Sequence, residues 1–158
     1  MKLAFIFVGR GGRKTEWLEE LYGEYEKKIG YFLPVEIVRL KPSRQGRESS
    51  DQKLLEETAE ILKALKKDDV VIVCDERGEE LSSLAFSRKL VRAFERGKPR
   101  VVIVVGGAFG FGDEVRRRAD WVWSLSKLTM NHLVAQAVVL EQTYRALTIW
   151  KNLPYHNE

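Results

Sequence analysis

Cysteine and histidine are both scarce in this sequence. Its 158 residues include one cysteine, Cys74, and two histidines, His132 and His156. A single cysteine cannot form an intrachain disulfide, which is typical of proteins kept in a reducing cytoplasm. Two histidines are too few for an all-histidine metal site, and no Ser-His-Asp or Cys-His arrangement can be assembled. The sequence therefore predicts no metal site and argues against hydrolases that use such triads.

Long hydrophobic runs and linker segments are also missing. No apolar run approaches the roughly 20 residues that a membrane-spanning helix needs. The run Leu3–Val8 is too short for the apolar region of a signal peptide, and no small-residue cleavage site follows it. Without a linker, repeat or low-complexity tract, residues 1–158 predict one domain. We expect a cytoplasmic protein that neither crosses nor is anchored in a membrane.

Basic residues are in modest excess. The chain has 27 Lys+Arg against 23 Asp+Glu, a net charge of +4 and a pI near 9.2. This balance permits a polyanionic partner but does not require one, because basic clusters are equally common on solvated surfaces. The clusters are Arg10, Arg13 and Lys14; Lys41, Arg44 and Arg47; Arg88, Lys89, Arg92 and Arg96; and Arg116, Arg117 and Arg118.

Short β-branched runs alternate with amphipathic segments along the chain. The runs predict strands at Leu3–Val8, Val35–Leu40, Val70–Cys74, Val101–Val105 and Trp121–Trp123. Apolar residues at helical spacing mark three helices between them: Trp17, Leu21 and Tyr25; Leu54, Thr58, Ile61 and Leu65; and Leu84, Val91 and Phe94. Ser49, Ser50 or Asp51 supplies the cap of the second helix.

The predicted order of elements is that of a doubly wound α/β sheet. The unbroken apolar runs Val70–Val73 and Val101–Val105 are typical of central parallel strands covered on both faces. In such sheets ligands bind beyond the carboxyl ends of the strands. We therefore expect the site in the loops after Cys74 and Val105.

A glycine-rich segment follows the strand that ends at Val105. Residues 106–112 contain four glycines, which indicates tight turns or close backbone approach to a ligand. The segment lacks the Lys-Ser/Thr of a phosphate-binding loop and the spacing of a dinucleotide-binding turn. It fits either a ligand without phosphates or a plain turn into a short helix at 113–118.

The last long helix is predicted from Leu133 to Trp150. Its first half is apolar on every side, so it lies in the core or in a subunit interface, and a chain this small favours a dimer. The polar residues Gln136, Glu141, Gln142 and Arg145 need partners there, and Glu141 and Arg145 are spaced to form an ion pair.

Three motifs taken together resemble a known family. They are Gly106-Gly107 with Gly110, Ser124-Leu125-Ser126-Lys127-Leu128-Thr129, and Leu140-Glu141-Gln142-Thr143-Tyr144-Arg145-Ala146 with the closing Tyr155-His156. In order and spacing the chain resembles the RlmH type of SPOUT methyltransferases, which methylate N3 of a pseudouridine in large-subunit ribosomal RNA. The resemblance covers the whole chain.

The resemblance implies a SPOUT-type α/β knot, a homodimer, and S-adenosylmethionine as methyl donor, with ribosomal RNA or the assembled ribosome as partner. The implied cofactor contacts are Cys74, Gly106, Leu125, Ser126, Lys127, Leu128, Thr129 and Met130. The implied catalytic group is His156, assisted by Tyr155 and Arg145. Phosphate contacts would come from Arg10, Arg13, Lys14, Arg88 and Arg92.

The chain departs from that family at two positions. Asn131 stands where proline is usual, and Gln136 stands where arginine is common, which predicts a missing positive charge near the substrate. Three alternatives therefore remain: a catalytically silent RNA- or ribosome-binding module, a methyltransferase with another RNA target, and a flavodoxin-like nucleotide binder. The last predicts a phosphate-bearing ligand and a monomer.

Overall fold

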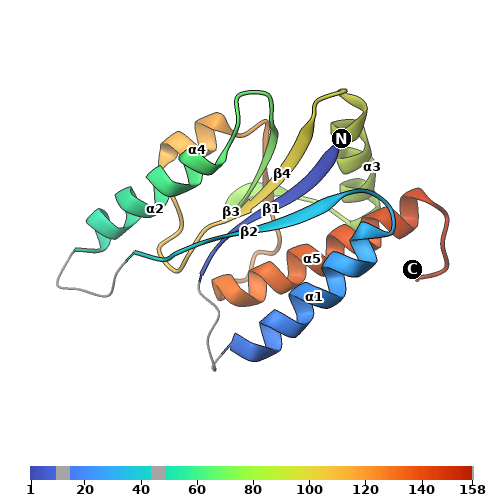
Figure 1. Cartoon of the computed structure of the whole chain (residues 1–158), viewed down its shortest axis with the longest axis horizontal. Helices are drawn as coiled ribbons and strands as arrows, with labels where there is room; N and C mark the ends of the chain where they lie inside the picture. The colour runs from blue at the N-terminus through green and yellow to red at the C-terminus, as the bar shows by residue number, and fades with distance from the viewer. Residues whose placement is uncertain (10–14, 44–48, 158) are drawn as a thin grey trace.

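Five strands and five helices alternate along the part of the chain that the structure describes. The computed structural model describes residues 1–9, 15–43 and 49–157 (Figure 1). In chain order the elements are β1 (Lys2–Val8), α1 (Glu16–Gly30), β2 (Val35–Leu40), α2 (Ser50–Ala64), β3 (Val70–Glu80), α3 (Ser83–Glu95), β4 (Arg100–Val105), α4 (Asp113–Arg118), β5 (Trp121–Ser124) and α5 (His132–Trp150).

The strands form one parallel sheet in the order β2-β1-β4-β3-β5. Helices α1, α3 and α5 cover one face and α2 and α4 cover the other, which gives two hydrophobic clusters (Figure 1). Every residue of β4 is buried because helices lie on both sides of it. The predicted doubly wound α/β sheet is confirmed, and the knot stays a prediction.

Helix starts follow the side-chain caps of the sequence. Ser49 caps α2 by accepting a hydrogen bond from the Gln52 backbone N–H at 3.3 Å, as one of the predicted candidates. Asn131 caps α5 in the same way, accepting from the Leu133 backbone N–H at 2.8 Å. Asn131, which stands where the family usually has proline, is therefore the N-cap of α5. Among the described residues, no helix is long and apolar enough to cross a membrane.

The predicted apolar face of α1 is only partly in the core. Leu18, Tyr22 and Ile29 are the buried residues of this helix. Trp17 lies on the neighbouring face and is 47% exposed. Leu21 and Tyr25 of the predicted face pack against the core, so Trp17 is the member of that face that the described chain leaves exposed.

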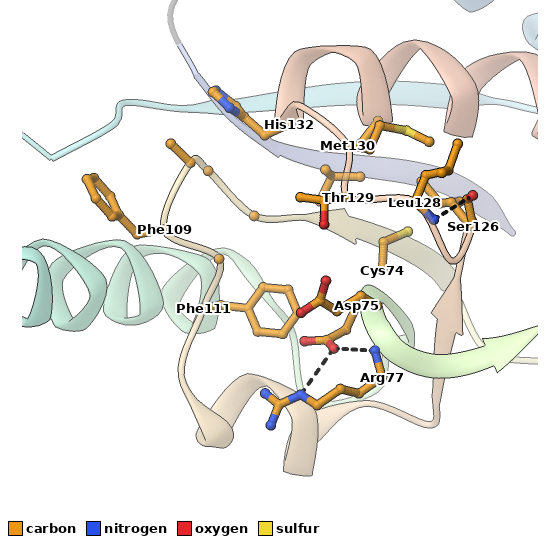
Figure 2. A pocket seen from close by; sticks show the side chains of 18 of the residues that line it. Cys74, Asp75, Arg77, Phe109, Phe111, Ser126, Leu128, Thr129, Met130 and His132 are labelled. Atoms are coloured by element: carbon orange, nitrogen blue, oxygen red, sulfur yellow. Dashed lines mark hydrogen bonds and ion pairs between the residues drawn. The ribbon is translucent and has the colours of Figure 1, made fainter.

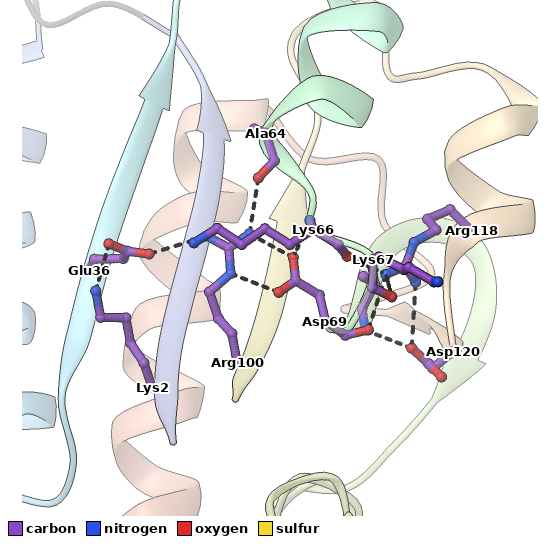
Figure 3. A network of polar contacts seen from close by, with 10 residues as sticks. Lys2, Glu36, Ala64, Lys66, Lys67, Asp69, Arg100, Arg118 and Asp120 are labelled. Carbon is purple, nitrogen blue, oxygen red and sulfur yellow. Dashed lines mark hydrogen bonds and ion pairs between the residues drawn. The ribbon is translucent and has the colours of Figure 1, made fainter. Parts of the chain in front are cut away.

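A buried ion pair joins the strands at their amino ends. The Arg100 guanidinium donates to both carboxylate oxygens of Asp69, at 2.9 and 2.6 Å, and to the Ala64 carbonyl oxygen at 3.0 Å (Figure 3). Glu36 accepts a further bond from the same group at 3.2 Å. Because both charges are almost fully buried and hydrogen-bonded, this network holds the end of the sheet opposite the predicted site.

Strand β3 is longer than predicted because it contains a bulge. Its pairing with β5 shifts register between Cys74 and Glu79. Gly78 lies within the bulge, where a Cβ would meet the Val122 backbone at 2.7 Å. The close approach requires glycine, and the bulge pushes Asp75 and Arg77 out at the carboxyl edge of the sheet.

Candidate active site

A pocket of about 520 Å³ lies at the carboxyl edge of the sheet, where residues 74–77 of β3 and the segments after β4 and β5 meet the first turn of α5. Side chains from all of these segments face it (Figure 2). Of the predicted cofactor contacts, those that line the pocket are Cys74, Gly106, Leu125, Ser126, Leu128, Thr129 and Met130. Lys127 is exposed and does not line it.

The glycine-rich loop forms one wall of the pocket. A Cβ at Gly106 would meet the Gly110 carbonyl oxygen and the Phe111 ring, each at 2.9 Å. Gly110 has φ +74 and its N–H donates to the Gly107 carbonyl oxygen at 2.9 Å, which closes a tight turn. From α2, the Thr58 hydroxyl accepts a hydrogen bond from the Gly112 N–H at 2.8 Å. Glycine is therefore needed for the loop to pack against itself.

The opposite wall is a hydroxyl-stabilised turn after β5. The Ser124 hydroxyl donates to the Ser126 carbonyl oxygen at 3.2 Å, and the Ser126 hydroxyl accepts from the Leu128 N–H at 3.0 Å. These local bonds hold the turn open and leave the Leu125, Leu128 and Met130 side chains around the hollow (Figure 2). Apolar walls of this kind suit a flat heteroaromatic ligand.

The sequence did not single out an ion pair at the pocket mouth. Asp75 accepts hydrogen bonds from the Arg116 guanidinium at 2.6 and 2.8 Å and from the Arg77 backbone N–H at 2.8 Å. Burial alone would raise the pKa of Asp75, but these hydrogen bonds and charges lower the pKa overall. Asp75 is therefore an anion beside the pocket. Its position directly after Cys74 was the only signal for it in the sequence.

Cys74 itself is not a nucleophile in this environment. Burial, with a smaller effect from the Asp75 charge, raises the pKa of the Cys74 thiol well above its usual range. The neutral thiol contributes an apolar surface to the pocket floor. Among the described residues, no group of three or more His, Cys, Asp and Glu could hold a metal ion.

Gln136 lies in the interior, where its side chain has the hydrogen-bond partners that a buried amide needs, and the effect of the missing arginine on the RNA substrate stays a prediction. Its side chain is fully buried, its amide oxygen accepts from the Tyr22 hydroxyl, and its amide nitrogen donates to the Val8 carbonyl oxygen at 3.1 Å. Burial raises the pKa of Tyr22, so the phenol stays protonated and acts as the donor. This neutral link joins α1, β1 and α5.

Tyr22→Phe should lower the free energy of unfolding by about 1–3 kcal/mol, because it leaves a buried amide oxygen without a donor. Urea denaturation followed by circular dichroism measures the change. Tyr31→Phe is the matched control: Tyr31 is 84% exposed, so its loss of a hydroxyl should stay within about 0.5 kcal/mol. Equal effects at the two tyrosines would contradict the structural role of the Tyr22–Gln136 link.

Glu57 of α2 is a carboxyl group buried beneath the glycine-rich loop. It is 3% exposed, and its Oε2 has no hydrogen-bond partner among the described residues. A Cβ at Gly107 would meet Glu57 Oε1 at 2.5 Å, so the carboxyl presses directly on the loop. Burial, with a smaller effect from the Glu56 charge, raises the pKa of Glu57, and the opposing charge of Lys53 does not offset this rise.

Glu57→Gln should stabilise the protein at pH 8 and have little effect near pH 4. The folded-state pKa of Glu57 is above its unfolded value, so its contribution to stability is lost as pH rises through the folded-state pKa. A neutral amide avoids this loss, and we expect a gain of about 1 kcal/mol or more at pH 8. Denaturation at both pH values tests this, with the exposed Glu60→Gln as control. A gain that is independent of pH would contradict it.

The predicted catalytic residues gather at the far end of α5. Arg145 donates to Glu141 Oε1 at 2.5 and 3.0 Å, which confirms the predicted ion pair, and its guanidinium lies 4.8 Å from the Tyr155 ring centre. Arg145 also donates to His156 Nδ1 at 3.2 Å. Because a guanidinium can only donate, neutral His156 carries its proton on Nε2. Burial first, then the nearby Glu141 charge, raises the pKa of Tyr155 to about 12.

This cluster lies in the second half of α5 and beyond it, whereas the pocket lies at the first turn of the helix. The pocket reaches His132 and Ala135, whereas Arg145 is more than two helical turns further on. At 1.5 Å per residue, His132 and Arg145 are about 20 Å apart along the helix. Within one chain, the structure does not bring the predicted catalytic and cofactor residues together.

The basic residues predicted to contact phosphate are only partly placed. Arg88 and Arg92 are exposed on α3 and form no ion pair with any described residue. Arg10, Arg13, Lys14, Arg44 and Arg47 lie outside the described residues.

The sequence that forms this sheet and pocket matches a known protein family. Residues 1–156 match the family described as "Predicted SPOUT methyltransferase", and the chain belongs to that family. Members of this family use S-adenosylmethionine as methyl donor. The fold class and the resemblance inferred from the motifs are thereby confirmed.

Within the family, the chain is similar over its full length to proteins named ribosomal RNA large subunit methyltransferase H. It is 45% identical over 155 residues to the protein of Bdellovibrio bacteriovorus, covering 98% of this chain and 99% of the relative. The protein of Syntrophotalea carbinolica is 38% identical over 99% of both chains. That of Methylobacillus flagellatus is 37% identical over 100% of both.

Proposed function

We propose that this chain transfers a methyl group from S-adenosylmethionine to N3 of a pseudouridine in large-subunit ribosomal RNA, as a cytoplasmic homodimer. The pocket between the glycine-rich loop and residues 125–130 is the observation that carries this proposal. It lies at the edge where doubly wound sheets bind ligands. The full-length similarity to enzymes named for methylation of large-subunit ribosomal RNA supports the substrate class.

The residues of the pocket fit S-adenosylmethionine. Gly106 lets the glycine-rich loop pack closely against itself as one wall, and Leu125 and Met130 offer apolar surface for an adenine. The two cations that line the described part of the pocket, Arg77 and Arg116, both pair with Asp75. Asp75 and Arg116 at the mouth provide charges of both signs for an amino-acid moiety. When bound, the donor supplies an electrophilic methyl group on a sulfonium.

A second copy of the chain is needed to complete the site. Methyl transfer requires the reacting atoms to be about 3 Å apart, whereas the cluster and the pocket of one chain are about 20 Å apart along α5. Apolar residues near the start of α5 are left partly or largely exposed, including Val134 at 45%, and Trp17 of α1 is 47% exposed. An isologous dimer through these faces would cover them and set the cluster of one subunit against the pocket of its partner. The trefoil knot implied by the family belongs to the same proposal.

The cluster acts on the target base in this proposal. The reaction is an in-line displacement in which N3 attacks the methyl carbon, and alignment of the two reactants supplies much of the rate. Arg145 fixes His156 as an Nε2–H donor. That donor can bond to a carbonyl oxygen of the base and stabilise negative charge as the N3 proton leaves to solvent.

Mixing two inactive variants tests the shared site. Gly106→Val disables the pocket and Arg145→Ala disables the cluster, so neither homodimer should be active. After denaturation and refolding together, half of the dimers should be mixed, with one of two sites intact, which restores about a quarter of the wild-type rate. Methylation of ribosomes with labelled donor measures this. A mixture that stays inactive would show that each site is built within one chain.

Calorimetry with S-adenosylmethionine separates this proposal from the alternatives. We expect one binding site per subunit in the purified protein. Absence of detectable binding would favour a silent RNA-binding module, and tighter binding of a phosphate-bearing nucleotide would favour a flavodoxin-like protein.

A further inference from the structure

A second hollow, unrelated to the cofactor pocket, lies between the end of α1, α5 and the C-terminal segment. This groove has a volume of about 630 Å³ and is lined by Glu24, Lys27, Lys28, Tyr31, Phe32, Tyr144 and Leu153. Tyr31 is 84% exposed and Leu153 is 44% exposed. Solvated apolar and aromatic surface of this kind is unusual unless a partner covers it.

Aromatic rings connect the groove to the catalytic cluster. The ring centres of Tyr31 and Phe32 are 5.4 Å apart, and Phe32 lies 6.2 Å from Tyr144. Tyr144 in turn contacts Tyr155 at 4.8 Å. Because Tyr155 lies under the Arg145 guanidinium, the row of rings leads directly from the exposed groove to the residues that we place on the target base.

Two lysines border these rings. Lys28 lies over the Tyr25 and Tyr144 rings, at 5.2 and 5.5 Å from the ring centres, and pairs with Glu24 at 2.7 Å. Lys27 is exposed and forms no ion pair with any described residue. Its ammonium is therefore available to an anion at the edge of the groove.

We propose that this groove binds a nucleotide of single-stranded RNA next to the target base. Aromatic rings flanked by lysines are the arrangement that holds single strands, because every base can stack on a ring while the backbone phosphate meets a cation. The base stacks on Tyr31 and Phe32, and the phosphate lies against Lys27. The inference deepens the proposed function and rests on its RNA substrate.

The first test measures methylation of ribosomes. Tyr31→Ala should raise the KM for ribosomes about tenfold, within the usual range for loss of a stacked base, while the Kd for S-adenosylmethionine stays unchanged. Tyr31→Phe keeps the ring and should retain the wild-type KM. Leu55→Ala on α2 is the control for loss of an exposed apolar side chain, since Leu55 is 67% exposed on the other face of the sheet.

The second test measures RNA binding without methyl transfer. Fluorescence anisotropy with a labelled single-stranded oligouridine should show weaker binding for Tyr31→Ala and for Lys27→Glu. Lys63→Glu makes the same charge change on α2, and we expect it to weaken oligouridine binding less than Lys27→Glu does. One combined outcome separates the groove from the proposed function. If the wild-type protein methylated no RNA but Tyr31→Ala and Lys27→Glu still lost oligouridine binding, the groove would be supported and the proposed function would be wrong.

Two results would contradict the proposal that this groove binds RNA. One is an unchanged KM and unchanged oligouridine affinity in both Tyr31→Ala and Lys27→Glu. The other is a change of Tyr31→Ala from dimer to monomer in analytical ultracentrifugation, which would show that a second copy of the chain occupies the groove.

Discussion

Gly106→Val is expected to abolish useful binding of S-adenosylmethionine while the protein remains folded. Even the first carbon of a side chain at this position would meet the Gly110 carbonyl oxygen and the Phe111 ring at 2.9 Å. The glycine-rich loop must then move into the space that the ligand needs. Overpacking of about 3 kcal/mol corresponds to a loss of affinity of about 100-fold, which calorimetry measures directly.

Gly23→Val is the matched control for this change. Gly23 is exposed on α1, and a Cβ there meets no atom within 4 Å. We expect its Kd for S-adenosylmethionine to equal that of the wild type. If Gly106→Val bound the donor with wild-type affinity, the pocket assigned here would be the wrong one.

Arg145→Ala is expected to lower kcat by about 100-fold or more without changing the Kd for S-adenosylmethionine. The guanidinium holds Glu141, Tyr155 and His156 together, and it fixes the proton of neutral His156 on Nε2. Without it, His156 loses the partner that orients its donor toward the base. The pocket does not include Arg145, so donor binding is a separate measurement.

Arg145→Lys distinguishes the geometry of the guanidinium from its charge. A lysine keeps the positive charge but cannot donate to Glu141 and His156 with the same planar fork, so we expect kcat between those of Arg145→Ala and the wild type. His156→Ala should reproduce much of the Arg145→Ala defect. A kcat within threefold of wild type in both alanine variants would remove the cluster from the mechanism.

Local signals were sufficient to predict the elements of the fold. Each predicted strand is present, and the bounds agree to within one residue except in β3, whose bulge lengthens it to Glu80. Alternating runs and caps such as Ser49 act over a few residues, so they can be read from the sequence. The bulge depends on pairing with β5, about 50 residues away, so no local sequence pattern predicts it.

The site was predicted in part, for the same reason. The resemblance to the family implied residues 125–130 as cofactor contacts, and all of them except Lys127 line the pocket. Contacts made by folding could not be seen: Arg116 reaches Asp75 across 41 residues, and Tyr22 meets Gln136 across 114. The need of Gln136 for a partner could be predicted from its place in an apolar helix, but the identity of that partner, Tyr22, could not.

Transfer of labelled methyl from S-adenosylmethionine to ribosomes that lack the modification, followed by mapping of the labelled base, tests the central proposal most directly. We predict label in large-subunit ribosomal RNA, on N3 of a pseudouridine, and its absence when Arg145→Ala replaces the wild type. A methyl group on a ribose or on a base carbon, or no label in large-subunit RNA, would contradict the account.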